Sequence, residues 1–224
     1  MDLQIDVGSS IGKVSGILLR PADAWAGYVL AHGAGAGMRH HFMEEIAEAL
    51  AGRGMATLRY QFPYLESGAK RPDPPAVLEA TVRAAVAAGR EIMPELPLVA
   101  GGKSLGGRMT SNAQAKHPLA GVSGLVFLGF PLHPPKQPGE KRADHLEAVD
   151  LPMLFLQGTR DALAQLDLII AVCHRLGSKA TLHVVEGADH SFAVLKRSGR
   201  NEAEVMDELA DTTAGWCRSL LSPL

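Results

Sequence analysis

Short apolar runs alternate with longer amphipathic stretches along the chain. A strand that is buried on both faces of a parallel sheet has a continuous apolar sequence, so we interpret these runs as strands. Eight strands are predicted, over residues 3–7, 14–20, 28–31, 56–60, 98–100, 125–129, 153–156 and 181–185. A glycine and two serines at positions 8–10 lie between the first two strands and predict an opening hairpin.

Apolar side chains recur at helical spacing between most of these strands. Such stripes are found at Phe42, Ile46, Ala49 and Leu50, at Leu78, Val82, Ala85 and Val86, and at Val205, Leu209, Trp216 and Leu220. Alternating strands and helices after an antiparallel start predict a three-layer α/β fold, with helices on both sides of a mostly parallel sheet of about eight strands. The sequence has no internal repeat and no long linker, so we expect a single domain over residues 1–224.

The composition excludes several classes of partner. The 224 residues carry a net charge of −2 and are 46% apolar, so the chain has no general electrostatic attraction for nucleic acid or membranes. The first ten residues lack the apolar core of a signal peptide, and Cys173 and Cys217 fall in helix-like segments. We therefore expect a reduced, cytoplasmic protein that binds neither nucleic acid nor a membrane.

The stretch LPLVAGGKSLGGRM at residues 96–109 predicts a turn between a strand and a helix at 109–117. A phosphate-binding P-loop would need glycine at position 97, where a proline offers no backbone N–H. The pentapeptide from Gly102 to Gly106 instead matches G-x-S-x-G, the nucleophile elbow. In that motif the strained serine, here Ser104, projects its hydroxyl from the edge of the sheet, and the glycines let strand and helix approach closely.

A nucleophilic serine needs a base and an acid, in the chain order Ser, Asp, His for this type of elbow. His190 lies in the loop after the last predicted strand, and Asp161 in the loop after the strand before it. Both loops are at the carboxyl edge of the sheet, where ligands bind in open α/β folds. Asp189 is the rival acid, but as the neighbour of His190 it is poorly placed to hold the ring, and Asp150 precedes its strand. We therefore predict the triad Ser104, Asp161 and His190.

An oxyanion hole requires one amide from the residue after the nucleophile, which is Leu105, and a second from a loop after an earlier strand. The glycine-rich sequence HGAGAG follows the strand at 28–31 and supplies the amide of Ala34. The dinucleotide-binding pattern G-x-G-x-x-G would need glycine where Met38 stands. We interpret His32 in this loop as structural, because triads do not take their base from this position.

The rest of the predicted site comes from loops. We expect Gly35, Tyr64 and His133 to contact the substrate, and the Pro- and Gly-rich stretch 131–139 to act as an active-site loop. Only about twenty residues separate the strand that ends near position 130 from the next one, which is too few for an inserted domain with its own core. We therefore expect no lid domain.

Two cations flank the elbow. Lys103 and Arg108 could attract an acidic substrate, although we interpret Lys103 as a charge on the surface. The neighbours His40 and His41 cannot face one ligand together on a helix, which argues against a metal site there. Acyl transfer to a serine needs no cofactor, and we expect neither a cofactor nor a metal.

The motifs HGAGAGM, RYQFPY, GGKSLGGRM, GFPLHPP, QGTRD and GADHSF make the sequence resemble the α/β-hydrolase superfamily over nearly its whole length. More narrowly, it is similar to a branch of small dienelactone-hydrolase-like proteins. That branch includes bacterial predicted hydrolases and the hydrolase-like domain of a subunit of a eukaryotic chromatin acetyltransferase complex. Dienelactone hydrolases proper have a cysteine nucleophile where this chain has Ser104. The resemblance thus implies the fold and serine-hydrolase chemistry, but not lactone specificity.

The predicted function is hydrolysis of a small soluble carboxylic ester or thioester through an acyl-enzyme on Ser104, by a monomer or a homodimer. The alternative is a hydrolase-like protein-interaction module without catalytic activity, which the chromatin-complex relative suggests. The complete set of triad residues favours the enzyme, because function depends on the site and not on the fold alone. The sequence does not define the acyl group or the leaving group.

Overall fold

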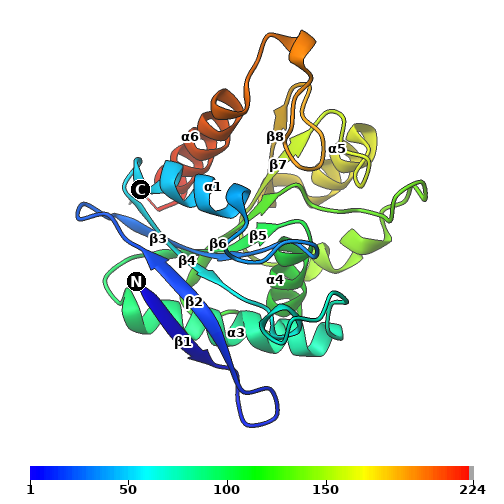
Figure 1. Ribbon diagram of the computed structural model, residues 1–224. Coiled ribbons are helices and arrows are strands. Elements are labelled where there is room, and N and C mark those ends of the chain that lie inside the picture. Colours follow the sequence, from blue (N-terminus) through cyan, green and yellow to red (C-terminus); the bar gives the residue numbers. More distant parts are fainter. Residues whose placement is uncertain (222–224) are drawn as a thin grey trace.

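Eight strands form one continuous sheet in the order β1-β2-β4-β3-β5-β6-β7-β8 (Figure 1). The computed structural model describes residues 1–221. The strands are β1 (Asp2–Asp6), β2 (Lys13–Leu19), β3 (Ala26–Ala31), β4 (Met55–Tyr60), β5 (Leu98–Lys103), β6 (Val122–Leu128), β7 (Met153–Gly158) and β8 (Ala180–Val185). All eight predicted strands are therefore confirmed, with ends that differ by a few residues.

The direction of the strands also follows the prediction. β1 and β2 form an antiparallel hairpin, and β2 pairs with β4 in antiparallel register. Every other neighbouring pair, from β4 across to β8, is parallel. The continuous apolar runs lie at the centre of this sheet, and every residue of β3 and β4 is buried.

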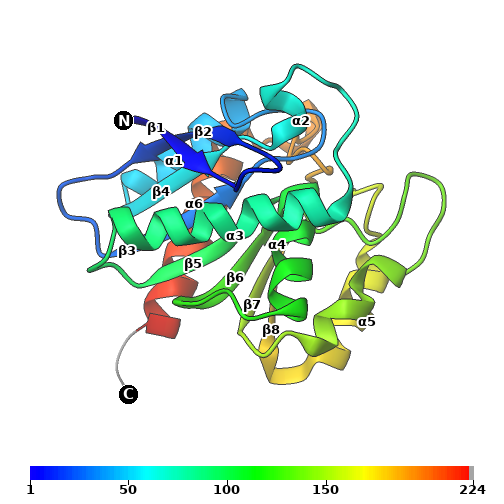
Figure 2. The same ribbon diagram turned by 90° about the horizontal axis from the view of Figure 1, so that it is seen from below.

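Helices cover both faces of the sheet, which gives the predicted three layers (Figures 1 and 2). One face is covered by α1 (His41–Ala51) and α6 (Glu202–Leu221), and the other by α3 (Pro75–Ile92), α4 (Leu105–Lys116) and α5 (Leu166–Leu176). The short elements are α2 (Pro63–Glu66) and the 3₁₀ helices η1 (Lys141–Ala148), η2 (Gly177–Lys179) and η3 (Lys196–Ser198). The core is divided accordingly into two apolar clusters, one on each side of the sheet.

The helix after the elbow begins four residues earlier than predicted, at Leu105 instead of 109. Two glycines in its first turn hide the start, because glycine has a low helix propensity and no side chain to show periodicity. The tight contact with the sheet explains their presence. A Cβ atom on Gly106 would lie 2.6 Å from the carbonyl oxygens of both Ala31 and His32.

The segment between β6 and β7 contains η1 and no inserted domain within residues 1–221. The prediction of a fold without a lid is confirmed.

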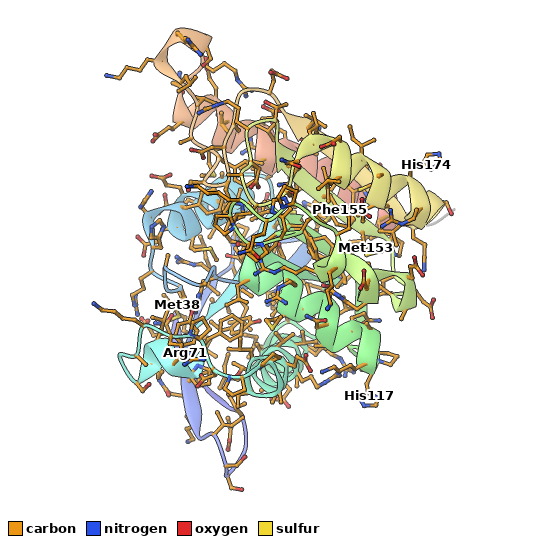
Figure 3. The ribbon with its side chains drawn as sticks, turned by 90° about the vertical axis from the view of Figure 1, so that its right-hand side faces the viewer. Met38, Arg71, His117, Met153, Phe155 and His174 are labelled. Atoms are coloured by element: carbon orange, nitrogen blue, oxygen red, sulfur yellow. The ribbon has the colours of Figure 1, made fainter. Side chains whose placement is uncertain are left out.

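Figure 3 shows which side chains lie inside the molecule and which lie on its surface. Met153 and Phe155 of β7 lie inside the molecule, whereas His117 and His174 lie on its surface. His117 follows the last turn of α4, and His174 lies in the last turn of α5.

The order of the strands creates a crevice at one place. β3 lies between β4 and β5. The next strand in the sequence, β4, is added on one side of β3, and the later strands β5 to β8 are added on the other side. The loops that follow β3 and β5 therefore leave the sheet in opposite directions at its carboxyl edge, and ligands bind at such a switch point. The HGAGAG loop follows β3, and Ser104 follows β5.

Candidate active site

Ser104 occupies a sharp turn between β5 and α4. Its backbone has φ 50° and ψ −113°, a conformation that L-residues rarely adopt and that is retained at functional sites when the surroundings enforce it. The surroundings here are the glycines on either side of the serine. A Cβ atom on Gly102 would lie 2.1 Å from Ala31 O, so no other residue at this position fits against β3.

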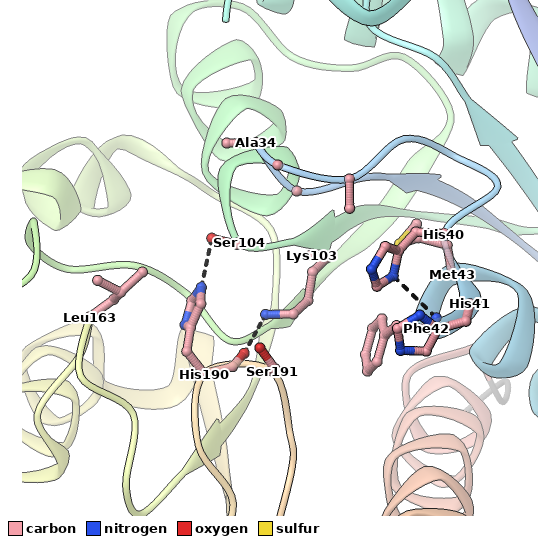
Figure 4. Close-up of a pocket in the computed structure, with 13 residues that line it drawn as sticks. Ala34, His40, His41, Phe42, Met43, Lys103, Ser104, Leu163, His190 and Ser191 are labelled. Carbon is pink, nitrogen blue, oxygen red and sulfur yellow. Dashed lines mark hydrogen bonds between the residues drawn. The ribbon is translucent and has the colours of Figure 1, made fainter. Parts of the chain in front are cut away.

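The three side chains of the predicted triad form one hydrogen-bonded chain, of which Figure 4 shows the part between Ser104 and His190. The distance from His190 Nε2 to Ser104 Oγ is 2.8 Å, and that from His190 Nδ1 to Asp161 Oδ2 is 2.7 Å. An ionised carboxylate can only accept hydrogen bonds, so Nδ1 carries a hydrogen and donates a hydrogen bond to Asp161. Nε2 is then free to accept from the Ser104 hydroxyl. This is the protonation state in which the imidazole can act as a base toward the serine.

Asp161 is held by more than the histidine. Its side chain is fully buried, and Oδ1 accepts from the Leu163 amide at 2.7 Å while Oδ2 also accepts from Gln157 Nε2. Gln157 in turn accepts from the Phe130 amide with its Oε1 at 3.0 Å. The role of Gln157 was not predicted, although a buried polar residue at the end of the apolar strand β7 was a visible signal.

Asp189, the rival acid, has a different function in the structure. Its Oδ1 accepts from the amides of Ser191 at 2.8 Å and Ala193 at 3.1 Å. These bonds close the loop that carries His190, and no bond to the imidazole of His190 is found within the described part of the chain. The geometry therefore favours Asp161 over Asp189 as the partner of the ring.

The loop after β3 carries the predicted oxyanion amide. Ala34 and Ser104 line the same pocket, and the amides of Ala34 and Leu105 donate no hydrogen bond to another group within residues 1–221. Tyr64 stabilises this loop, because its hydroxyl donates a hydrogen bond to Ala34 O at 2.8 Å. His32 is also structural, as predicted. It accepts from the Phe62 amide at 3.0 Å, and burial lowers its pKa to about 4, so the ring stays neutral.

The pocket at Ser104 has a volume of about 460 Å³. It lies between the loop after β3, the start of α1 and the loop that carries His190 (Figure 4). The lining residues are Gly33, Ala34, Gly35, Ala36, His40, His41, Phe42, Met43, Lys103, Ser104, Leu163, His190 and Ser191. No carboxylate is among them.

Of the three residues expected to contact substrate, only Gly35 lines this pocket. Tyr64 is buried beneath the loop that it braces, and burial raises its pKa to about 12. His133 is also buried, and its amide donates to Leu163 O at 3.1 Å. No residue of the stretch 131–139 lines the pocket, so this segment supports Leu163 and does not form the wall that was expected.

The interpretation of Lys103 as a surface charge is wrong. Its side chain turns inward, and Nζ donates to the main-chain oxygen of His190 at 2.5 Å (Figure 4). The ammonium group also lies over the rings of Phe42 and Phe192, 5.9 and 5.3 Å from their centroids. Burial lowers the pKa of Lys103 to about 8, against the opposing effect of Asp161 and Asp189. One signal for this orientation was visible in the sequence: Lys103 directly precedes Ser104, so the sharp turn at the serine also decides where the lysine side chain points.

A second serine–histidine contact lies outside the pocket. Ser111 Oγ on α4 is 2.7 Å from His145 Nε2 on η1. Ser111 is fully buried, and burial together with the charge of Arg108 lowers the pKa of His145 to about 4. This pair joins η1 to α4 and presents no accessible nucleophile. Arg108 faces this side too, away from the residues that line the pocket.

Within residues 1–221 no group of three or more His, Cys, Asp or Glu side chains is arranged to hold a metal ion. The same residues include no helix with both the length and the apolar character needed to cross a bilayer. The two cysteines are buried and unpaired.

A mostly parallel sheet with a serine at the β5–α4 turn, followed in sequence by Asp161 and His190 at later strand ends, defines an α/β-hydrolase fold. The family model described as "Alpha/beta hydrolase domain" matches residues 25–218. The chain belongs to this family, and the resemblance predicted from its motifs is confirmed.

Several solved structures share the whole fold. The chain is similar to a dienelactone hydrolase from Anabaena variabilis, with 21% identity, 99% of each chain covered and a TM-score of 0.75. A serine hydrolase without a lid from Xanthomonas campestris has 19% identity and a TM-score of 0.75, with 100% of this chain and 96% of that chain covered. Est1E from Butyrivibrio proteoclasticus, solved with bound ferulic acid, has 16% identity and a TM-score of 0.74, with 99% and 100% covered. At these identities the likeness concerns the fold.

Proposed function

We propose that the protein is a serine hydrolase that cleaves small, soluble carboxylic esters or thioesters through an acyl-enzyme on Ser104. One observation carries the proposal: the unbroken hydrogen-bonded chain from Ser104 Oγ through His190 to Asp161, at 2.8 and 2.7 Å. Such a chain converts a weakly nucleophilic hydroxyl into an attacking group. The serine also opens into a pocket, so a substrate can reach it.

The reaction begins when Ser104 Oγ attacks the acyl carbon and His190 Nε2 accepts the hydroxyl proton. Asp161 remains ionised and stabilises the imidazolium that forms. The negative charge that develops on the substrate oxygen is received by the amides of Leu105 and Ala34, which have no other acceptor within the described residues. His190 then gives its proton to the departing alcohol or thiol. A water molecule, activated by the same imidazole, releases the acid and restores Ser104.

The pocket favours short substrates. Its volume of about 460 Å³ is near the lower end for small-molecule sites, roughly 300–1,000 Å³. Phe42, Met43 and Leu163 give it apolar walls, but no lid formed by the described residues covers its mouth. A long acyl chain would therefore leave most of its surface in water, and would add little binding free energy.

The proposal is tested with a fluorophosphonate probe and a panel of p-nitrophenyl esters and thioesters of increasing chain length. We expect one covalent adduct on the peptide that contains Ser104, and turnover that the Ser104→Ala protein lacks. The Ser111→Ala protein is a matched control, since Ser111 also contacts a histidine and its loss should leave labelling intact. If a well-folded wild-type sample gave no adduct and no turnover, the chain would be a hydrolase-like interaction module instead.

A further inference from the structure

Lys103 is a partly buried cation that the mechanism above does not use. It is the residue before the nucleophile, at the end of β5, and its ammonium group contacts the main chain of His190, whereas the serine hydroxyl contacts the ring (Figure 4). Removing an ammonium group from water is costly unless polar partners replace the water. Within residues 1–221, no carboxylate forms an ion pair with Lys103 at 4.0 Å or less. The groups that stabilise the ammonium group at this position must therefore be neutral.

Those partners lie in the loop that carries His190 and in α1, whose Phe42 stacks on that loop. The ammonium group donates to His190 O at 2.5 Å. It also lies over two stacked rings, Phe42 of α1 and Phe192 of the histidine loop, whose centroids are 5.8 Å apart. An ammonium over aromatic faces is stabilised by the ring quadrupoles. Lys103 thus joins β5, α1 and the histidine loop at one point.

The histidine loop needs such a support. Phe192 has a φ of 66°, which is strained for a residue with a side chain. The hydrogen bonds of Asp189 close the loop on itself but do not attach it to the sheet. The bond from Lys103 is the one that reaches the main chain of His190 from β5, among the hydrogen bonds of the described residues.

We infer that Lys103 is a positioning residue for the proposed base: its ammonium group fixes the main chain of His190, and thereby holds the imidazole between Ser104 and Asp161. This inference rests on the proposed function. Ser104 and Lys103 are adjacent in the sequence, so the nucleophile and the anchor of its base move as one unit. A shift of the base by about 1 Å costs on the order of 100-fold in rate. Lys103 therefore controls turnover without touching the substrate.

The first test replaces Lys103 by methionine, which keeps the length of the side chain and removes the charge. With p-nitrophenyl acetate, a neutral ester, we expect kcat to fall by about 10- to 100-fold and KM to change by less than about threefold. Lys116→Met is the matched control, because Lys116 lies on α4 and pairs with Glu79 away from the pocket. It should retain wild-type kcat. An unchanged kcat in Lys103→Met would overturn the inference.

The same assay separates positioning from substrate binding, because Lys103 also lines the pocket. A monoester of a dicarboxylic acid is compared with its neutral analogue of equal length. If Lys103 bound a substrate carboxylate, Lys103→Met would raise KM for the anionic ester alone and leave the neutral ester unaffected. That result would overturn the positioning role.

Rescue provides a readout that a purely structural role would not give. In Lys103→Cys, alkylation with 2-bromoethylamine forms a thioether and releases bromide, which restores an ammonium group at lysine length. The native thiols are buried and their pKa values are raised to about 11 and 12, so wild-type protein treated in the same way serves as the control. We expect kcat to return to within about threefold of wild type in the same protein sample. Failure of alkylation to raise kcat would contradict the inference.

The pH profile follows from the charge. The groups that face Lys103 are Asp161 after β7, Asp189 and His190 after β8, and His40 and His41 at the start of α1. Since the pKa of Lys103 is lowered to about 8, we expect wild-type kcat to decline above this pH, with a Ser104→Ala blank subtracted. The decline should be absent in Lys103→Met. The deprotonation of Lys103 does not itself destabilise the fold: the native state binds fewer protons at this group than the unfolded state between about pH 8 and 10.5, so this group favours folding as the pH rises there.

A structural measurement keeps the inference testable apart from activity. The proton between His190 Nδ1 and Asp161 should give a low-field resonance in wild-type protein, and Lys103→Met should broaden it through faster exchange, whereas Lys116→Met should not. A wild-type protein with this resonance but without turnover or adduct would refute the proposed function alone. An unchanged resonance in Lys103→Met would refute the positioning role alone.

Discussion

Replacing Asp161 by asparagine tests the assignment of the acid with little change in shape. In the wild type, Oδ2 accepts from two donors, His190 Nδ1 at 2.7 Å and Gln157 Nε2. Oδ1 accepts from the Leu163 amide. The asparagine oxygen can take only one of these places. If it stays with Leu163, the new NH₂ group faces two donors, and one of them must change.

The size of the expected loss of kcat depends on which of the two donors, Gln157 or His190, stops donating to residue 161. Gln157 cannot turn its amide without losing the bond from the Phe130 amide to its Oε1. The imidazole can change its tautomer, so that Nδ1 accepts and Nε2 carries the proton. Nε2 then cannot accept from Ser104, and the expected loss of kcat is about 10⁴-fold, or about 5.5 kcal/mol in the activation free energy. Any unsatisfied donor that remains lowers the free energy of unfolding by about 1–3 kcal/mol.

The assay measures kcat/KM for a short-chain p-nitrophenyl ester together with the melting temperature. Asp189→Asn is the matched control, because asparagine retains an oxygen that can accept from the Ser191 and Ala193 amides. We expect this variant to lose less than about tenfold in kcat/KM. A larger loss for Asp189→Asn than for Asp161→Asn would show that the acid has been assigned to the wrong aspartate.

Three further predictions concern the elbow, the oxyanion loop and the pocket. Gly106→Ala should reduce fluorophosphonate labelling by at least about tenfold, because its Cβ would lie 2.6 Å from two carbonyl oxygens of the β3 end; wild-type labelling rates would contradict the packing argument. Tyr64→Phe removes the hydroxyl that holds Ala34 O and should lower kcat by about 3- to 30-fold with a small change in melting temperature; equal kcat values would show that the loop is held by other contacts. Finally, kcat/KM should stop rising beyond short acyl chains, without a jump at the micellar concentration, since within residues 1–221 no lid encloses the pocket of about 460 Å³; a steady climb to long chains would refute this.

The fold was predictable because both of its signals are local. Continuous apolar runs mark strands that are buried on both faces, and the three stripes mark helices that cover them. The placing of Ser104, Asp161 and His190 at one edge then follows from the direction of parallel strands. Element ends were less predictable, as the start of α4 shows. Its first turn contains Gly106, which packs against the end of β3, and Gly107, which packs against β5 and β6, and neither glycine favours a helix.

The supporting residues could not be read from the sequence, because their roles depend on where long side chains turn. Tyr64 lies in the short helix α2 and His133 in a loop, and the structure turns both away from the pocket. Lys103 occupies a strand end, where a lysine is normally hydrated, and turns inward to meet His190. Gln157 supports an acid four residues away across a turn. Each of these contacts joins segments whose relative positions only the folded chain defines.

The parts of the proposed triad differ in how rigidly they are held. Ser104 follows β5 directly, and Asp161 lies three residues beyond the end of β7, so the sheet itself positions both. His190 lies five residues beyond β8, in a loop. The sheet therefore fixes the nucleophile and the acid, whereas the base depends on contacts made by the loop: the turn closed by Asp189, the stacked ring of Phe192 and the bond from Lys103. Because the contacts of Asp189 and Lys103 are hydrogen bonds to the loop itself, changes in them should alter turnover more than the fold or substrate affinity.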